Sequence, residues 1–198
     1  MNFAYDPQQD FYYLGEELPT SGFLRNKLAE APRIIGVDTE TISLKERIAI
    51  GVSIALSPTC CFYFPLFPNP SPSTPWYLLK DPSYTKVFHN AMFDLSCMRE
   101  YEIDTTNVVD TNIEARLQCF KWCDLSSMAP VHEMEVHDAG DMLKEAGVKT
   151  MIELPQRIVA RKCIQDSIAT LRLHQILENK TNQEYFKMEM ATLPIMEK

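Results

Sequence analysis

Two carboxylates at the end of a short apolar run are the first residues in this sequence that could do chemistry. Asp38 and Glu40 close the segment 33–41, whose isoleucines and valine are typical of a strand covered on both faces. Side chains alternate along a strand, so both carboxylates point to the same side. Two negative charges beside an apolar strand are costly unless a cation lies between them, and hard divalent cations prefer carboxylate oxygens. An isolated Asp-x-Glu pair, however, more often marks a solvated strand end than a metal site.

Three further acidic residues lie where a strand or a helix could bring them to the same place. Asp94 is in the first turn of a helix expected directly after a strand, where an acid also complements the helix dipole. Asp110 closes a strand-like run and could cap the helix that follows. Asp166 lies on the largely apolar face of a long helix, and helices seldom bury an aspartate without a partner. Asp166 is therefore the hardest of the three to explain by local structure alone.

The elements that must position these residues follow from apolar periodicity and turn residues. Apolar runs predict strands at 11–14, 33–41, 47–55, 60–64, 86–89 and 107–111. Amphipathic runs, with Asn90 as the expected N-cap of the second, predict helices at 19–31, 90–98, 112–122, 138–146, 156–179 and 182–198. Five prolines between residues 65 and 75 predict a surface loop within one domain. Strands followed by alternating strands and helices predict an α/β or α+β sheet covered on both faces.

Composition and charge narrow the possible functions. The chain has 198 residues, which suits one domain, and a net charge of −8, which argues against broad electrostatic binding to duplex nucleic acid. The six cysteines are irregularly spaced, so we expect reduced thiols rather than a secreted disulfide framework. No signal segment begins the chain and no apolar run approaches the roughly 20 residues of a membrane span. We therefore expect no membrane partner and a cytoplasmic location, in a bacterium or in a virus-infected host cell.

Taken in order, the acidic segments resemble a known family of nucleases. Residues 38–41 (Asp-Thr-Glu-Thr), 89–94 (His-Asn-Ala-Met-Phe-Asp) and 166–174 resemble the three exonuclease motifs of the DnaQ-like (DEDD) superfamily. The segments are most similar to those of the proofreading exonuclease domain of family-A DNA polymerases. The resemblance implies an RNase H-like α/β fold in which helices flank a central five-stranded mixed sheet. We expect an exonuclease domain at 1–180, whereas 181–198 resembles the helical segment that leads into a polymerase domain, which would be absent from this chain.

The resemblance also implies a two-metal nuclease site. Asp38, Glu40, Asp94 and Asp166 would be its metal-binding and catalytic carboxylates, and two Mg²⁺ or Mn²⁺ ions suit their oxygens. Such ions activate a water and stabilise the leaving 3′ oxygen. The implied enzyme is a 3′→5′ exodeoxyribonuclease that releases nucleoside 5′-monophosphates from single-stranded or frayed 3′ ends. Its partners would be the 3′ end of single-stranded DNA and a polymerase domain, in cis or as a separate subunit.

Three residues are expected to contact the substrate because of their positions in these motifs. Leu44 matches a leucine that wedges against the terminal bases, although it could equally be a core residue that anchors the turn. Asn90 matches an asparagine near the strand end, although an N-cap role would also explain it. Thr39 could offer its backbone N–H to the terminal nucleotide.

Lys162 is the residue at which this sequence departs from the family. The family has a tyrosine four residues before the last aspartate, or in a sister group a histidine five before it, and here those positions hold Lys162 and Arg161. Near two metal ions a lysine would be driven toward its neutral form and could act as a base, or it could bind the scissile phosphate. Lys162 is thus a candidate catalytic residue. Two alternatives stay open: a weakened or inactive exonuclease fold kept as a polymerase scaffold, and a stand-alone 3′→5′ exonuclease of DNA or RNA.

Overall fold

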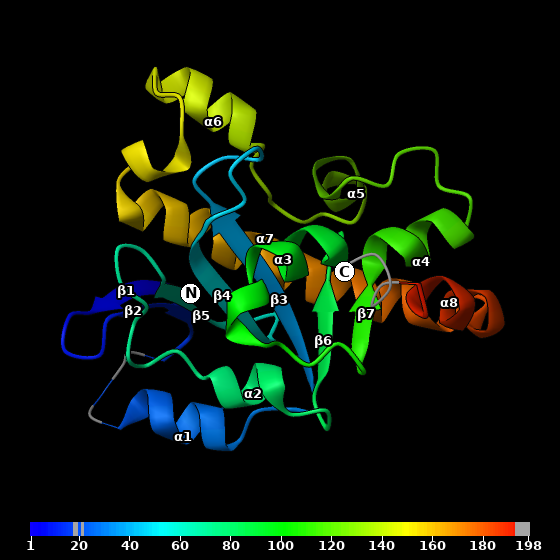
Figure 1. Cartoon of the computed structure of the whole chain (residues 1–198), viewed down its shortest axis with the longest axis horizontal. Helices are drawn as coiled ribbons and strands as arrows, with labels where there is room; N and C mark the ends of the chain where they lie inside the picture. The colour runs from blue at the N-terminus through cyan, green and yellow to red at the C-terminus, as the bar shows by residue number, and fades with distance from the viewer. Residues whose placement is uncertain (18–19, 21, 193–198) are drawn as a thin grey trace.

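A seven-stranded mixed sheet forms the centre of the computed structural model, which describes residues 1–17, 20 and 22–192 (Figure 1). The strands lie in the order β1-β2-β5-β4-β3-β6-β7. β3 pairs antiparallel with β4 and parallel with β6, which makes the sheet mixed. The strands are β1 (Asn2–Asp6), β2 (Phe11–Gly15), β3 (Ile34–Thr41), β4 (Ala49–Ser57), β5 (Cys60–Pro65), β6 (Thr85–Phe88) and β7 (Val108–Asp110).

The RNase H-like fold expected from the sequence is confirmed. The five expected core strands are neighbours in the order β5-β4-β3-β6-β7, with β3 at their centre. The predicted strand at 11–14 is β2, which pairs antiparallel with β5 and with β1. β1 was not predicted, because its apolar run, from Phe3 to Tyr5, is only three residues long. The β1-β2 hairpin therefore extends the family's central sheet at the β5 edge.

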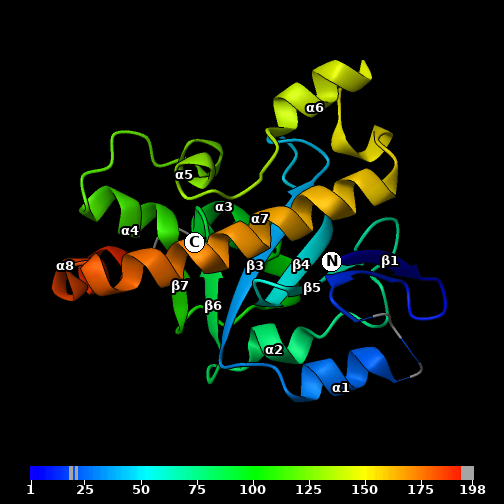
Figure 2. The same cartoon turned by 180° about the vertical axis from the view of Figure 1, so that it is seen from behind.

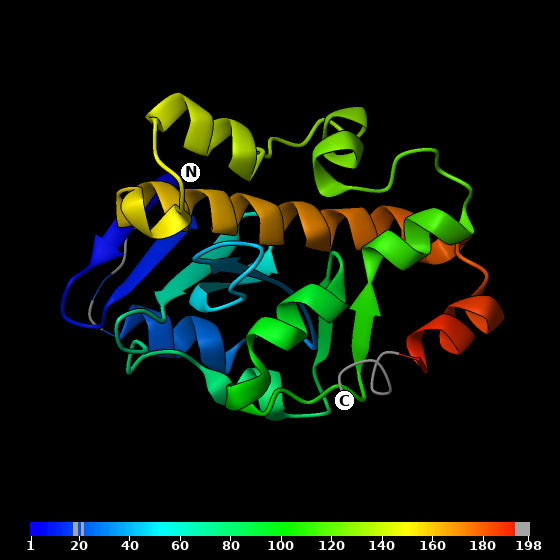
Figure 3. The same cartoon turned by 45° about the horizontal axis from the view of Figure 1, so that its top comes forward.

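Helices cover both faces of the sheet, as the strand and helix order predicted. α7 crosses one face and packs on β3, β4 and β5, whereas α1, α2 and α3 cover the other face (Figures 1 and 2). α5 and α6 lie beside α7 on its outer side (Figure 3). The helices are α1 (Phe23–Ala29), α2 (Trp76–Lys80), α3 (Ala91–Cys97), α4 (Thr111–Leu117), α5 (Leu125–Val131), α6 (Ala139–Ala146), α7 (Gln156–Leu177) and α8 (Gln183–Met190).

Several helices are shorter than predicted. α1 occupies the centre of the predicted 19–31. α4 ends at Leu117 rather than at 122, because Cys119 adopts a left-handed backbone with φ 61°. α8 covers the first half of the predicted 182–198, of which residues 193–198 lie outside the described part of the chain. α6 ends where expected, at Gly147 with φ 69°. α5 was missed because Pro130 lies inside it, near its C-terminal end, where proline normally argues against a helix.

Close packing of α7 on β3 brings the two elements that carry most of the acidic residues together. Gly36 in β3 faces α7, and a Cβ atom placed there would collide with the carbonyl oxygen of Ser167. The same Cβ would lie 2.8 Å from the Cβ of Leu171. Only a glycine allows this approach, so Gly36 sets the distance between the strand and the helix. Within the described residues, no helix has both the length and the apolar composition needed to cross a bilayer.

Candidate active site

Asp38 and Glu40 lie at the C-terminal end of β3, on the side that faces α7. One carboxylate oxygen from each residue and the sulfur of Cys163 in α7 lie within 4.8 Å of one another. The Cys163 thiol donates a weak hydrogen bond to the backbone oxygen of Asp38, at 3.4 Å. The expectation that both carboxylates point to one side of the strand is therefore confirmed, and that side is buried rather than solvated.

Lys162 and Asp166 complete this side of the site from α7. They are one helical turn apart, and the Lys162 ammonium donates to Asp166 Oδ2 at 2.7 Å. The same ammonium donates to Glu40 Oε1 at 2.7 Å, across the boundary between α7 and β3. None of the three side chains is more than 10% exposed. Lys162 therefore joins the strand carboxylate and the helix carboxylate in one buried ion-pair network.

Asp94 approaches from the other side of β3, at the start of α3. Its Oδ1 accepts a hydrogen bond from the backbone N–H of Thr39 at 3.0 Å and another from the Thr39 hydroxyl at 2.6 Å. α3 begins three residues after β6, which is the parallel neighbour of β3, so the topology places its first turn beside Thr39. The acid in the first turn is thus fixed by the strand and not only by the helix dipole.

Asp110, at the end of β7, holds the helix that carries Asp94. The backbone N–H groups of Asn90 and Ala91 donate to its two carboxylate oxygens at 3.0 and 2.9 Å. Asp110 also accepts from the N–H of Asn112 at 2.8 Å, which confirms the predicted cap of α4. The prediction that the Asn90 side chain caps α3 is wrong: Asn90 has φ 73° and makes no side-chain cap hydrogen bond. The start of α3 is thus held by Asp110 and not by the Asn90 side chain.

Burial and mutual repulsion dominate the electrostatics of the carboxylates. Burial, followed by the charges of Asp166 and Asp94, raises the pKa of Asp38 well above its ordinary value. Burial also raises the pKa of Asp94 to about 7, although the hydrogen bonds from Thr39 oppose the rise. For Lys162 burial lowers the pKa, but the surrounding carboxylates outweigh burial and raise the pKa well above the ordinary value. The lysine is therefore a cation between carboxylates and not a neutral base in this geometry.

The unpartnered oxygens of the cluster fit a divalent cation. Asp38 Oδ2 and Asp166 Oδ1 are buried and make no hydrogen bond within the described structure. Unpaired buried carboxylate oxygens are costly, and a hard cation would satisfy them. Burial raises the pKa of the Cys163 thiol well above its ordinary value, and a soft sulfur is a poor ligand for hard cations such as Mg²⁺. The available donors are thus carboxylate oxygens, which suit Mg²⁺ or Mn²⁺ better than Zn²⁺.

The three residues expected to contact substrate lie around this cluster in different situations. Leu44 follows β3 and is 80% exposed, which excludes the alternative that it is a buried turn anchor. The backbone N–H of Thr39 is directed at Asp94, so it is not free to bind a nucleotide in this geometry. Asn90 lies at the start of α3, four residues before Asp94. Their roles toward a substrate stay predictions.

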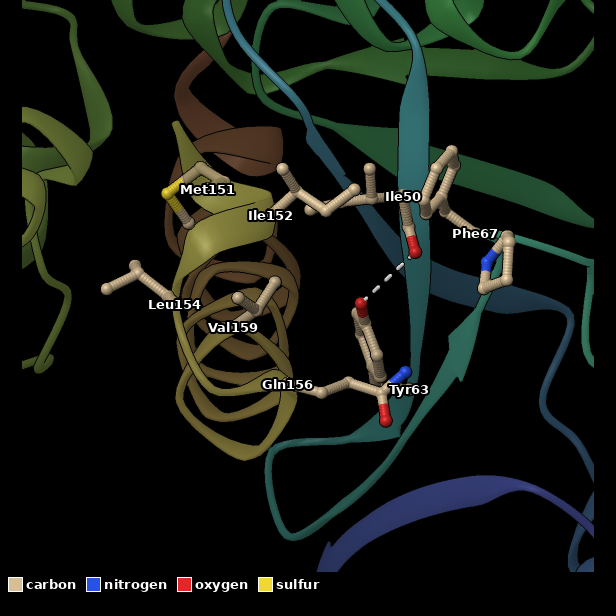
Figure 4. Close-up of a pocket in the computed structure, with 9 residues that line it drawn as sticks. Ile50, Tyr63, Phe67, Met151, Ile152, Leu154, Gln156 and Val159 are labelled. Atoms are coloured by element: carbon tan, nitrogen blue, oxygen red, sulfur yellow. Dashed lines mark hydrogen bonds between the residues drawn. The ribbon is translucent and has the colours of Figure 1, made fainter. Parts of the chain in front are cut away.

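An apolar cavity of about 230 Å³ lies next to the site and had no signal in the sequence. Its lining includes Ile50 and Tyr63 from the sheet, Phe67 from the loop after β5, and Met151 and Val159 from the region where α7 begins (Figure 4). The Tyr63 hydroxyl donates to the backbone oxygen of Ile50 at 3.4 Å across one wall (Figure 4). Val159 is one helical turn before Lys162. These residues come from distant segments, so only the folded chain brings them together.

Comparisons with known proteins agree with this geometry. The family model described as 3′-5′ exonuclease, which carries the name of the family-A DNA polymerases, matches residues 22–182. None of the curated proteins matches the sequence significantly. A solved structure titled "apo form of the nuclease" has 22% identity and a TM-score of 0.65, over 87% of this chain and 86% of that chain. Brucella melitensis NrnC bound to pGG has 19% identity and a TM-score of 0.63, over 83% of each chain.

The structural similarities support the fold, and the family match covers all four carboxylates of the cluster. Since the family model matches most of the sequence, this chain belongs to the 3′-5′ exonuclease family.

Proposed function

We propose that this chain is a 3′→5′ exodeoxyribonuclease that acts on single-stranded or frayed 3′ ends, as the proofreading domain of a family-A DNA polymerase. One observation carries the proposal: the charges of Glu40, Asp94 and Asp166 all act on Asp38, although the four residues come from three separate elements, and two of their buried oxygens have no partner among the described residues. Buried polar atoms in folded proteins are normally hydrogen-bonded, and a metal ion bound here would satisfy these two oxygens.

The proposed reaction is hydrolysis of the terminal phosphodiester bond. The oxygen of a water bonds to phosphorus, the bond to the 3′ oxygen breaks, and that oxygen takes up a proton. Asp38, Glu40, Asp94 and Asp166 would hold Mg²⁺ or Mn²⁺, two ions being the number that the resemblance implies. When bound, the metal supplies an activated water and stabilises charge on the leaving oxygen. Thr39 fixes the orientation of Asp94 through two hydrogen bonds.

The rest of the proposed substrate site surrounds this cluster. The exposed side chain of Leu44 would contact the terminal bases, and Asn90 would contact the last nucleotide. We also propose an exonuclease domain at 1–180 and a segment at 181–198 that connects it to a polymerase domain, in cis or as a separate subunit. The helix over Gln183–Met190 is compatible with such a connecting segment.

A stand-alone exonuclease is a second candidate function. This chain covers 86% of the first nuclease structure and 83% of NrnC, so the domain accounts for nearly all of those proteins. The NrnC structure contains pGG, which makes a short oligonucleotide a substrate worth testing. A catalytically silent scaffold is the third possibility, because Lys162 replaces the family's tyrosine.

Degradation of labelled oligonucleotides separates these functions. A 5′-labelled single-stranded DNA is incubated with the protein in Mg²⁺, Mn²⁺ or EDTA, beside a labelled RNA, pGG, and duplexes with a paired or mispaired 3′ end. The expected result is a ladder that shortens from the 3′ end only with a divalent metal, and faster on the mispaired end. The double variant Asp38→Ala, Glu40→Ala abolishes the ladder. The matched control Glu184→Ala, Glu189→Ala removes two exposed acids of α8 and retains activity.

The contrary outcomes point to the other candidates. Equal degradation of RNA, or cleavage of pGG without processing of longer DNA, would favour the stand-alone enzyme. If no ladder forms with either metal at high protein concentration, the exonuclease proposal fails and the scaffold remains.

A further inference from the structure

The ammonium of Lys162 occupies a position that a metal ion would otherwise share. It lies 2.7 Å from Glu40 Oε1 and 2.7 Å from Asp166 Oδ2, and the three side chains are at most 10% exposed. Glu40 and Asp166 are the two carboxylates that, by the resemblance, support the water-binding ion. One oxygen of each already accepts a hydrogen bond from this protein cation, which α7 carries.

A second divalent ion on the same two carboxylates would meet this cation at close range. Metal–oxygen bonds of Mg²⁺ are about 2.1 Å long, so an ion on an oxygen that also accepts from Lys162 would lie less than about 5 Å from the ammonium. Repulsion between like charges is strong at that distance in a buried site, because little solvent screens it. The lysine is also part of the chain, so it stays beside Glu40 and Asp166 at any metal concentration and competes with a metal ion for their oxygens.

Asp38 keeps an oxygen that Lys162 does not occupy. Its Oδ2 is buried without a hydrogen-bond partner among the described residues. The negative charges of Asp166 and Asp94 both act on Asp38, so both carboxylates lie in its neighbourhood. Asp166 Oδ1 is likewise buried without a partner there, and Asp94 is held in place by Thr39. One cation at Asp38 would satisfy what the lysine leaves unpaired.

We propose that the Lys162 ammonium permanently replaces one of the two metal ions, so that the chain binds a single divalent cation, held at Asp38. This inference rests on the proposed function, because it assumes that the carboxylates bind metal for catalysis. Lys162 is then a built-in cation that neutralises Glu40 and Asp166, and it stands where the family has a neutral residue that orients water.

Counting bound Mn²⁺ tests the proposal directly. The metal-free full chain is titrated with Mn²⁺, bound ions are counted by electron paramagnetic resonance and calorimetry, and the spectrum is inspected for magnetic coupling between two close ions. We expect one uncoupled Mn²⁺ in the wild type and two coupled ions in Lys162→Met, which removes the charge and keeps an unbranched side chain. Lys187→Met, which removes an exposed lysine of α8, is the matched control and should bind one ion.

Each other outcome overturns the proposal. Two ions, or none, in the wild type would show that Lys162 does not replace a metal, and this count needs no variant to fold. One ion in both the wild type and Lys162→Met would show that another feature limits the number, and Lys162→Gln repeats the comparison if the methionine variant is unfolded. The DNA ladder is measured on the same sample. A ladder with two bound ions refutes only this inference, whereas one bound ion without a ladder refutes only the nuclease function.

Discussion

Replacing Gly36 with alanine is expected to move α7 away from β3 and thereby disturb the whole site. An added Cβ would collide with the carbonyl oxygen of Ser167 and lie 2.8 Å from the Cβ of Leu171. The nearest atom belongs to the backbone, so no rotation of a side chain relieves the contact. The helix or the strand has to shift. Ser167 is adjacent to Asp166, so the shift acts directly on one of the proposed metal-binding carboxylates.

The expected loss of stability follows from the size of this clash. Overpacking by one methyl group costs about 1–3 kcal/mol, and a backbone obstacle places this case in the upper half of that range. Alanine also lowers the conformational entropy of the unfolded chain, which offsets about 0.4–1 kcal/mol of this loss of stability. The free energy of unfolding should therefore fall by about 2 kcal/mol. For a domain of this size that corresponds to a decrease in Tm of about 4–8 °C.

The expected effect of Gly36→Ala on the cleavage rate is larger than its effect on stability. Displacing a catalytic group by about 1 Å can lower a rate by about 100-fold. We therefore expect the Gly36→Ala variant to cleave a 5′-labelled oligonucleotide about 100-fold more slowly at a temperature where it is folded. Urea unfolding and an initial-rate assay on the same preparation measure both effects.

A second glycine substitution serves as the control. At Gly140 in α6 an added Cβ meets only the end of the Asp138 side chain, at 3.0 Å, so Gly140→Ala should change the stability by less than about 1 kcal/mol. If Gly36→Ala retained both the stability and the cleavage rate of the wild type, close packing of α7 on β3 would not be what positions the site.

Three further predictions follow from other buried charges. Lys162→Met leaves two buried carboxylates without their shared cation, so in EDTA its free energy of unfolding should fall by about 3–5 kcal/mol, and Mn²⁺ should restore part of this loss. Thermal unfolding with and without metal measures the change, and an unchanged Tm in EDTA would contradict it. Asp110→Ala removes the acceptor shared by the starts of α3 and α4, so the free energy of unfolding measured in urea should fall by about 2 kcal/mol. A loss below about 0.5 kcal/mol would mean that other groups cap both helices. Burial raises the pKa of Asp104, but hydrogen bonds from Lys86 and Thr106 outweigh burial and lower it. The charged carboxylate therefore stabilises the fold above its unfolded pKa of about 3.9, and this contribution is lost as the pH falls through the lower folded pKa. Asp104→Asn should cost about 2–3 kcal/mol at pH 7 and progressively less below about pH 4, and a difference that did not shrink in acid would refute the ion-pair explanation.

Much of the site could be anticipated because its signals are local. Alternation along β3 places Asp38 and Glu40 on one side, and helical periodicity places Asp166 on the inner face of α7. The order of the acidic segments then identified the family, and its fold followed. Predicted helix ends were less accurate, because left-handed residues such as Cys119 and the proline inside α5 override the apolar pattern.

What the sequence could not provide are the contacts between distant segments. Asn90 has the side chain of a typical N-cap residue, but it makes no cap hydrogen bond, and the N–H groups of Asn90 and Ala91 donate instead to Asp110 from another strand. Gly36 is unremarkable in the sequence and becomes essential only because α7 crosses the sheet at that point.

The sequence by itself determined on which side of β3 and on which face of α7 the acidic residues lie, because strand alternation and helix periodicity are properties of the local backbone. Only the tertiary structure decided the state of Lys162. In the sequence it is a lysine in place of a tyrosine, compatible with a base, a phosphate ligand or an inactive site. In the fold it lies 2.7 Å from Glu40, a residue 122 positions away, and 2.7 Å from Asp166. The charge of a buried group depends on its neighbours in space, and the chain sets those neighbours only when it folds.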